Sequence, residues 1–262
     1  MARKIRRRTT DVSSTEELNQ LAVDLDLTAL AETLPTLLER AEKNSPAFTD
    51  FALDMLRAEA HARKARQQTK CLKRSKLGAV EGLDDFDFTI RPKLDPRVVK
   101  ELRNCRFVDE HRNILCLGRP GLGKTRVAKA IAHAACLAGY TVFAVVTAQM
   151  LEQFFASEAD GTYRRVLRRY VAPELLVLDE FGYEPFTDKA TNYLFRLVSE
   201  RYKKGSIIVT ANTGFTAWKQ LFPSEANAVA TTDRLVDDAT ILRFTGKSYR
   251  QPREVIGAPL ED

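Results

Sequence analysis

Hydrophobic positions follow helical spacing in the first part of the chain and form short apolar runs in the second. Residues 14–76 place apolar side chains three and four positions apart, which is typical of amphipathic helices. One stripe consists of Leu27, Leu30, Leu34, Leu37 and Leu38, with Pro35 interrupting it. From residue 114 onward, short apolar runs alternate with helical stretches. This alternation predicts a parallel sheet with helices on both faces.

Five runs are expected to be strands, at residues 114–117, 141–147, 175–178, 206–210 and 239–245. The fold class is therefore α/β with a five-stranded parallel sheet, preceded by a small all-α N-terminal domain. The expected organisation is a disordered basic tail at 1–15, a helical domain at 16–77, a linker at 78–96, a nucleotide-binding domain at 97–250 and a loose tail at 251–262. In the linker, Phe86 and Phe88 are expected to pack on the following domain.

Composition sets few limits. The chain has 262 residues, with 41 basic and 35 acidic residues and a net charge of +6, which permits a nucleic-acid partner without proving one. No apolar run approaches the ~20 residues of a membrane span, so no membrane partner is expected. The basic N-terminus lacks the hydrophobic core of a secretory signal, which favours a cytoplasmic protein. Cys71 and Cys105 show no metal-like spacing, while Cys116 and Cys136 fit small buried hydrophobes.

The segment from Gly118 to Thr125 carries the strongest chemical signal. It fits G-x-x-x-x-G-K-[ST] and lies between an apolar run and a helical stretch, the context that a phosphate loop requires. Glycines let backbone amides wrap a phosphate, and the helix that follows directs its N-terminal amides at the same anion. Lys124 would contact the β- and γ-phosphates, and the Thr125 hydroxyl would bind Mg²⁺. The sequence therefore predicts that this protein binds a nucleoside triphosphate.

A second motif begins about 55 residues later, where the run 175–178 ends in Asp179 and Glu180. Ligands of open α/β sheets bind at the carboxyl ends of the strands, so both carboxylates would reach the phosphates. Asp179 would hold Mg²⁺, and Glu180 would polarise the attacking water. At the end of the run 206–210, Asn212 is preferred over Thr210 as the contact to the γ-phosphate or its water. The alternative for Asn212 is an ordinary turn residue.

Two basic segments are candidates for DNA contacts. Residues 57–76 hold eight basic residues and one acid, Glu59, and a run this one-sided favours phosphate contacts over a plain solvated face. The candidates in this run are Arg63, Lys64, Arg66, Lys70, Lys73, Arg74 and Lys76. A second set, Arg164, Arg165, Arg168 and Arg169, lies on one helical face. These four are either a cationic strip for a nucleic-acid backbone or surface arginines with no partner.

Taken in order, these motifs resemble the AAA+ P-loop ATPases of the IstB/DnaC-like family over roughly residues 27–250. The matching strings are Gly118–Thr125, 176–183, 208–212 through Trp218, Asp233-Arg234-Leu235 and 246–250. The helices that end in the basic run, followed by Phe86-x-Phe88, resemble the transposition helpers of insertion sequences more than the helicase loaders.

The resemblance implies a Mg²⁺-dependent ATPase that assembles on duplex DNA as rings or helical clamps. It implies little sequence preference, and recruitment and activation of a cognate transposase. Arg234 matches the arginine that reaches the ATP of the neighbouring subunit, and Arg250 matches a sensor arginine. The expected catalytic residues are Lys124, Glu180, Asn212 and Arg234. The expected nucleotide contacts are Gly118, Arg119, Pro120, Gly121, Leu122, Gly123, Lys124, Thr125, Arg126 and Arg250.

Three alternatives are weaker. A helicase loader would use its N-terminal helices as a protein interface, whose core is usually poor in charge, unlike residues 57–76. A small-molecule kinase would need a substrate pocket and lid that no part of the sequence resembles. A nucleotide-switched adaptor that never hydrolyses ATP would have no need of Glu180 as a base.

Overall fold

The computed structural model describes residues 14–249, apart from a few side chains within that range. The chain divides into two compact units, residues 1–67 and 68–262. Helix α3 (Phe48–Ser75) contains the boundary between them.

The first unit consists of α1 (Ser14–Asp24), α2 (Thr28–Asn44) and the part of α3 up to Gln67. Its small core contains Ala22, Leu30 and Leu34, with Met55 of α3 packed against it. Helix α2 continues through Pro35, so the predicted interruption is not a break in the helix. Proline removes one N–H donor and strains the preceding turn, and the packing of Leu30 and Leu34 offsets that local cost.

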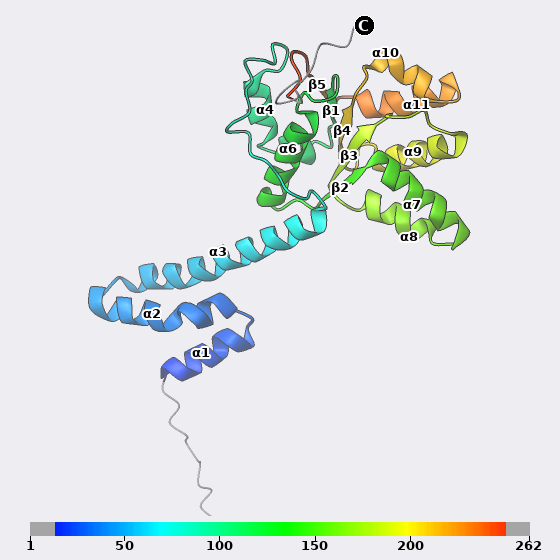
Figure 1. Cartoon of the computed structure of the whole chain (residues 1–262). Helices are drawn as coiled ribbons and strands as arrows, with labels where there is room; N and C mark the ends of the chain where they lie inside the picture. The colour runs from blue at the N-terminus through cyan, green and yellow to red at the C-terminus, as the bar shows by residue number, and fades with distance from the viewer. Residues whose placement is uncertain (1–13, 250–262) are drawn as a thin grey trace, which may run out of the picture. The chain divides into compact units, whose positions relative to one another are not determined.

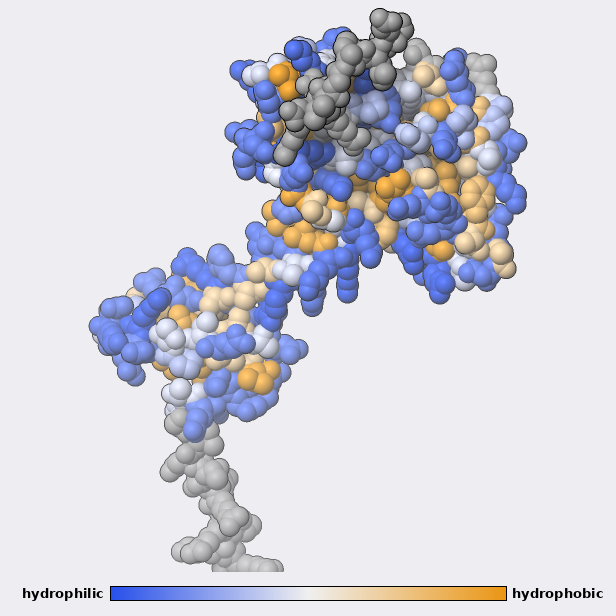
Figure 2. All heavy atoms as spheres, in the orientation of Figure 1, coloured by the Kyte–Doolittle hydropathy of each residue, from blue (hydrophilic) through white to orange (hydrophobic). Residues whose placement is uncertain are grey.

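Large hydrophobic side chains stay exposed on this unit. They belong to Leu21, Val23, Leu25, Phe48, Leu53 and Leu56. Orange and tan areas lie among hydrophilic residues on the same unit in Figure 2. Exposed apolar surface of this kind is common at sites of protein association.

A buried carboxylate joins α3 to the start of α2. Glu59 is 5% exposed, and its Oε2 accepts hydrogen bonds from the backbone amides of Ala29 at 3.0 Å and Leu30 at 3.1 Å. Its Oε1 accepts from Arg63 Nε at 2.8 Å and from Arg66 Nη2 at 3.0 Å. No side chain of the adjoining residue caps α2, so Glu59 supplies that cap from a distant helix.

Burial acts to raise the pKa of Glu59, but the hydrogen bonds from Arg63, Leu30 and Ala29 and the charge of Arg66 outweigh it and lower the pKa. A lowered pKa in the folded state means that the carboxylate stabilises the fold above the pKa of the unfolded chain, about 4.3. That contribution is lost as the pH falls toward the lowered value.

Glu59→Gln should therefore destabilise the helical unit at pH 7 and remove part of its acid sensitivity. Circular dichroism melts of the full chain at pH 7 and pH 3 measure both effects, and hydrogen exchange at pH 7 should assign the loss to residues 28–44. The control is Glu39→Gln, because Glu39 pairs with Lys43 on the same helix but its side chain is 66% exposed. Equal melting of the Glu59 variant and the wild type would contradict the capping role.

The second unit is built on five parallel strands in the order β2-β3-β4-β1-β5. This confirms the predicted five-stranded parallel sheet. The strands are β1 (Ile114–Leu117), β2 (Val142–Val146), β3 (Leu175–Phe181), β4 (Ser206–Ala211) and β5 (Thr240–Arg243). The helices are α4 (Pro96–Leu102), α5 (Arg106–Asp109), α6 (Lys124–Ala138), α7 (Thr147–Ala159), α8 (Tyr163–Val171), α9 (Asp188–Arg201), α10 (Phe215–Trp218), the 3-10 helix η1 (Lys219–Leu221) and α11 (Glu225–Val236).

Helices cover both faces of this sheet, as predicted. On one face α4 and α6 bury residues such as Val127 and Ile131, and on the other α7, α8, α9 and α11 bury residues such as Phe154, Leu194 and Leu235. Figure 1 shows the strands between these two groups of helices. Burial of both faces explains why the strands are continuous apolar runs. Cys116 and Cys136 are fully buried and Phe86 belongs to the first cluster, which confirms those three expectations.

Within residues 14–249, none of the helices combines the length and the apolar character needed to cross a membrane.

Candidate nucleotide-binding site

The phosphate loop connects β1 to α6. Gly118, Gly121 and Gly123 all have positive φ angles, of 154°, 75° and 90°. A Cβ on Gly118 would collide with the backbone of Phe244, and one on Gly123 would lie 2.6 Å from the Phe86 ring. Glycine is required here both for the turn and for the close approach of neighbouring segments. The loop thus leads directly into the N-terminus of a 15-residue helix, the arrangement that binds phosphate.

Lys124 is the first residue of α6 and is 6% exposed. Its Nζ donates to the carbonyl of Arg119 at 2.8 Å and to Asn212 Oδ1 at 2.9 Å. Asn212 follows β4, which pairs with β1 so that Ala211 is opposite Leu117. Because the two strands are parallel, the phosphate loop after Leu117 and Asn212 after Ala211 lie at the same edge of the sheet.

Burial raises the pKa of the nearby Cys116 thiol to about 12, against the attraction of Lys124. Cys116 is therefore neutral at physiological pH and does not compete with a phosphate for the lysine charge.

The acidic pair lies on β3, next to β4. The Asp179 carboxylate accepts from Thr125 Oγ1 at 2.8 Å and from Thr210 Oγ1 at 2.5 Å. Thr147 Oγ1 donates to the Asp179 backbone carbonyl at 2.9 Å. A hydroxyl and a carboxylate in contact beside a phosphate loop are the oxygen ligands that Mg²⁺ prefers, so this donor set fits the ion.

A cleft of about 580 Å³ joins these elements. Its lining among the described residues consists of Glu81, Pro120, Gly121, Leu122, Gly123, Lys124, Thr125, Arg126, Glu180, Tyr183, Thr210, Asn212 and Tyr249. The cleft brings together most of the predicted nucleotide contacts with Glu180 and Asn212. Gly118, Arg119 and Asp179 are not among these lining residues. Asp179 lies next to the cleft, where it accepts a hydrogen bond from the lining residue Thr125.

Arg126, a predicted nucleotide contact, is held by the linker in this structure. Its guanidinium donates to the Gly82 carbonyl at 2.9 and 2.6 Å and pairs with Asp85 and with Glu81. It also lies 5.8 Å from the centre of the Phe86 ring. The linker therefore forms one wall of the cleft and neutralises the charge of Arg126.

Residues that follow β5 support the loop from outside. Tyr249 donates its amide to the Gly121 carbonyl at 2.8 Å and its hydroxyl to the Asp87 carbonyl at 3.1 Å. The buried Arg91 donates to the carbonyls of Leu122 at 3.0 Å and Lys247 at 2.6 Å. The next residue, Arg250, lies outside the described residues.

Arg234 lies at the opposite edge of the sheet. Asn113, which precedes β1, donates to the carbonyls of Arg234 at 3.4 Å and Leu235 at 3.1 Å. Gly118 is five residues further along, about 16 Å at the usual strand rise. The Arg234 guanidinium stacks on the Phe195 ring at 5.0 Å and donates to the Ala230 carbonyl at 2.7 Å.

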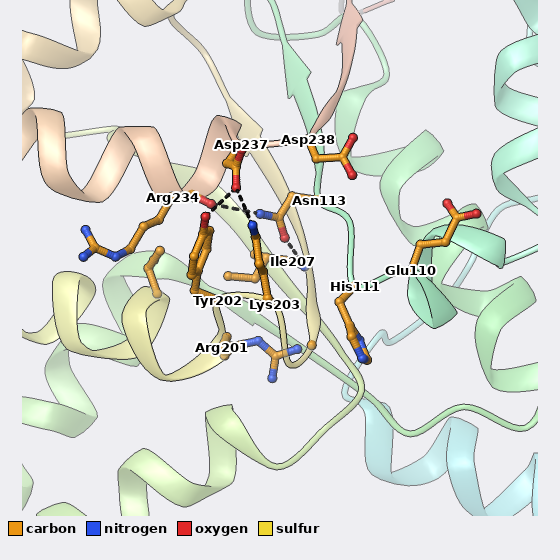
Figure 3. A pocket seen from close by; sticks show the side chains of 12 residues that line it. Glu110, His111, Asn113, Arg201, Tyr202, Lys203, Ile207, Arg234, Asp237 and Asp238 are labelled. Carbon is orange, nitrogen blue, oxygen red and sulfur yellow. Dashed lines mark hydrogen bonds and ion pairs between the residues drawn. The ribbon is translucent and has the colours of Figure 1, made fainter.

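Figure 3 shows a pocket of about 180 Å³ at this edge, with Arg234 pointing away from it. Tyr202 donates to Asp237 at 2.5 Å and Lys203 pairs with the same carboxylate at 3.6 Å, which fixes the end of α11 that carries Arg234. Arg234 is therefore remote from the phosphate loop of its own subunit.

The candidate DNA contacts differ in their environments. Arg63 and Arg66 are exposed but bind Glu59, and Arg66 also contacts Thr28. The remaining residues of that run, Lys64, Lys70, Lys73, Arg74 and Lys76, are exposed. On α8, Val166, Leu167 and Tyr170 are buried, while the arginines 164, 165, 168 and 169 are exposed on the other side.

A phosphate loop, a strand that carries Asp-Glu near its carboxyl end and this strand order define the P-loop AAA+ class of nucleotide-binding proteins. Residues 20–255 match the family of IstB-like ATP binding proteins, and the chain belongs to this family.

Two similar proteins are ATP-binding proteins of insertion sequences. The one from IS5376 of Geobacillus stearothermophilus is 32% identical over 235 residues, which cover 90% of this chain and 94% of that protein. The one from IS21 of Pseudomonas aeruginosa is 35% identical over 234 residues, 89% of this chain and 88% of that protein. Among solved structures, DnaI is similar in fold, with a TM-score of 0.53 at 20% identity over 64% of this chain and 92% of that one.

Several residues at the site were not singled out by their sequence pattern. Thr147 begins α7, and the sequence favours Asn212 over Thr210, yet Thr147 and Thr210 both contact Asp179. Glu81 and Tyr249 reach the cleft from segments far away in the sequence. The only local signal was the polar residue near the end of each apolar run, at Thr147 and Thr210.

Lys124→Ala should weaken ATP binding by about 100-fold or more, because the phosphates lose the positive charge that Lys124 places at the start of α6. Isothermal titration calorimetry measures the effect. Lys129→Ala, little more than one turn further along α6, is the matched control and should bind ATP like the wild type. Unchanged affinity of the Lys124 variant would refute the assignment of this cleft to the phosphates.

Proposed function

We propose that the protein is a Mg²⁺-dependent AAA+ ATPase that oligomerises on duplex DNA with little sequence preference and recruits and activates a cognate transposase. The observation that carries the proposal is the meeting of Lys124, Thr125, Glu180 and Asn212 at one cleft. Membership of the family and the insertion-sequence relatives support the link to transposition.

The cleft supports hydrolysis as well as binding. Lys124 would bind the β- and γ-phosphates, and Thr125 and Asp179 would hold Mg²⁺, which neutralises charge on the phosphates. Glu180 is exposed to the cleft and would take the proton of the attacking water. Asn212 would exchange its bond to Lys124 for a contact with the γ-phosphate or that water.

Arg234 supports action between subunits. It lies at the amino edge of the sheet while the cleft lies at the carboxyl edge, so it cannot serve the ATP of its own chain. A neighbour arranged head to tail could receive it, and such heterologous contacts generate rings or helical filaments. The guanidinium would stabilise the charge on the transferring phosphoryl group. The exposed apolar residues of the first unit are a further surface for assembly.

The basic residues support DNA binding. Four arginines on α8 and five exposed cations that do not pair with Glu59 offer charge for a phosphate backbone without base recognition; these five are Lys64, Lys70, Lys73, Arg74 and Lys76. Arg63 and Arg66 would contribute less, because Glu59 neutralises part of their charge.

Arg234→Ala should leave ATP affinity unchanged while the hydrolysis rate falls by about 10³-fold or more. Glu180→Gln should also bind ATP without turnover and remain assembled on DNA.

Mixing the two inactive variants should restore part of the activity. An Arg234→Ala subunit keeps Glu180 in its own cleft, and a Glu180→Gln neighbour supplies the intact Arg234 that this cleft needs. A steady-state ATPase assay of the mixture measures this. Failure of the mixture to recover, or equal loss of ATP binding by Arg234→Ala, would show that Arg234 is structural.

The function itself is tested by electron microscopy of the protein with random-sequence duplex, with and without ATP, at two salt concentrations. ATP-dependent rings, arcs or filaments that weaken at high salt are expected. Lys124→Ala is the control and should form none. Particles that stay monomeric and ignore duplex DNA would overturn the proposal and favour a helicase loader.

A further inference from the structure

A β-bulge places the two carboxylates of β3. Strands β3 and β4 pair in register up to Leu178 opposite Val209 and resume with Phe181 opposite Ala211. Two residues, Asp179 and Glu180, therefore lie opposite the single residue Thr210. Glu180 has a φ of 55°, a left-handed conformation that is uncommon for residues other than glycine. The irregularity thus coincides with the residues expected to bind Mg²⁺ and to activate water.

The bulge takes Glu180 out of the regular ladder of backbone hydrogen bonds. The Thr210 side chain provides the acceptor for the Glu180 amide instead. Thr210 is 1% exposed, and its Oγ1 accepts the Glu180 amide at 3.0 Å while donating to Asp179 Oδ1 at 2.5 Å. One hydroxyl therefore binds both members of the acidic pair, one through its backbone and the other through its side chain.

The hydrogen-bonding capacity of a hydroxyl limits what Thr210 can do. It has one proton to donate and two lone pairs. An ionised carboxylate only accepts, so the proton goes to Asp179 and none is left for an attacking water. Asn212, two residues later, contacts Lys124 directly instead. The two polar residues at the end of β4 thus act on different parts of the cleft.

We propose that Thr210 is a positioning residue for ATP hydrolysis, whose hydroxyl holds the bulge so that Asp179 and Glu180 face the phosphates together. The inference rests on the proposed ATPase function. Thr210 acts through the two carboxylates and does not touch the reacting atoms.

The test is the steady-state ATPase activity of Thr210→Val and Thr210→Ser. Valine keeps the shape and loses the hydroxyl, so kcat should fall about 10-fold or more while the affinity for ATP changes less than about threefold. Serine keeps the hydroxyl and should stay within about threefold of the wild-type kcat. Thr191→Val is the matched control, because Thr191 is fully buried and its hydroxyl has no partner among the described residues. This control should have wild-type activity.

A second readout separates positioning from general destabilisation. If Thr210 acts through Glu180, then adding Thr210→Val to Glu180→Gln should lower the single-turnover rate by less than about twofold further. Where the valine variant does not fold, Thr210→Ser and Thr210→Ala provide the comparison, since both lack the methyl group and only serine has the hydroxyl.

Wild-type kcat in Thr210→Val, or equal losses in the serine and alanine variants, would overturn the inference while leaving the ATPase function in place. Absence of ATP hydrolysis by the wild-type protein on duplex DNA would overturn the proposed function, and the role of Thr210 with it.

Discussion

The Asp179 carboxylate accepts hydrogen bonds from the hydroxyls of Thr125 and Thr210, and the organisation of the site depends on this group. Thr125 belongs to the helix after the phosphate loop, Asp179 to β3 and Thr210 to β4. The three elements are distant in sequence, and a parallel sheet brings their ends to one edge. A carboxylate and a hydroxyl in contact are oxygen ligands of the kind that Mg²⁺ prefers, so Asp179 and Thr125 together would hold a divalent cation at this edge.

A second set of contacts surrounds the phosphate loop with segments that precede and follow the sheet. Arg126 binds the acidic linker, and Arg91 and Tyr249 bind carbonyls of the loop and of each other's segments. These bonds hold the loop through its own carbonyls, from segments outside the sheet. The linker therefore contributes to the site as well as connecting parts of the chain.

The two edges of the sheet have separate roles in the proposed mechanism. The carboxyl edge holds the cleft, while the amino edge carries Arg234 on the Phe195 ring. In that mechanism a single chain could not bring Arg234 to its own cleft, so hydrolysis would depend on assembly with a neighbour. If assembly takes place on DNA, the exposed cations of α8 and of residues 64–76 would link ATP turnover to the presence of a duplex.

The sequence by itself determined the parallel sheet with helices on both faces, the phosphate loop and the strand that carries Asp179 and Glu180 near its carboxyl end. These features are local: apolar periodicity reports which faces are buried, and glycine spacing reports where the backbone must turn. Only the tertiary structure decided that Glu59 holds Arg63 and Arg66, that the linker holds Arg126, and that Thr210 faces the bulge in β3. A hydrogen-bond partner on a distant element depends on strand register and helix packing, which the order of residues along one segment does not reveal.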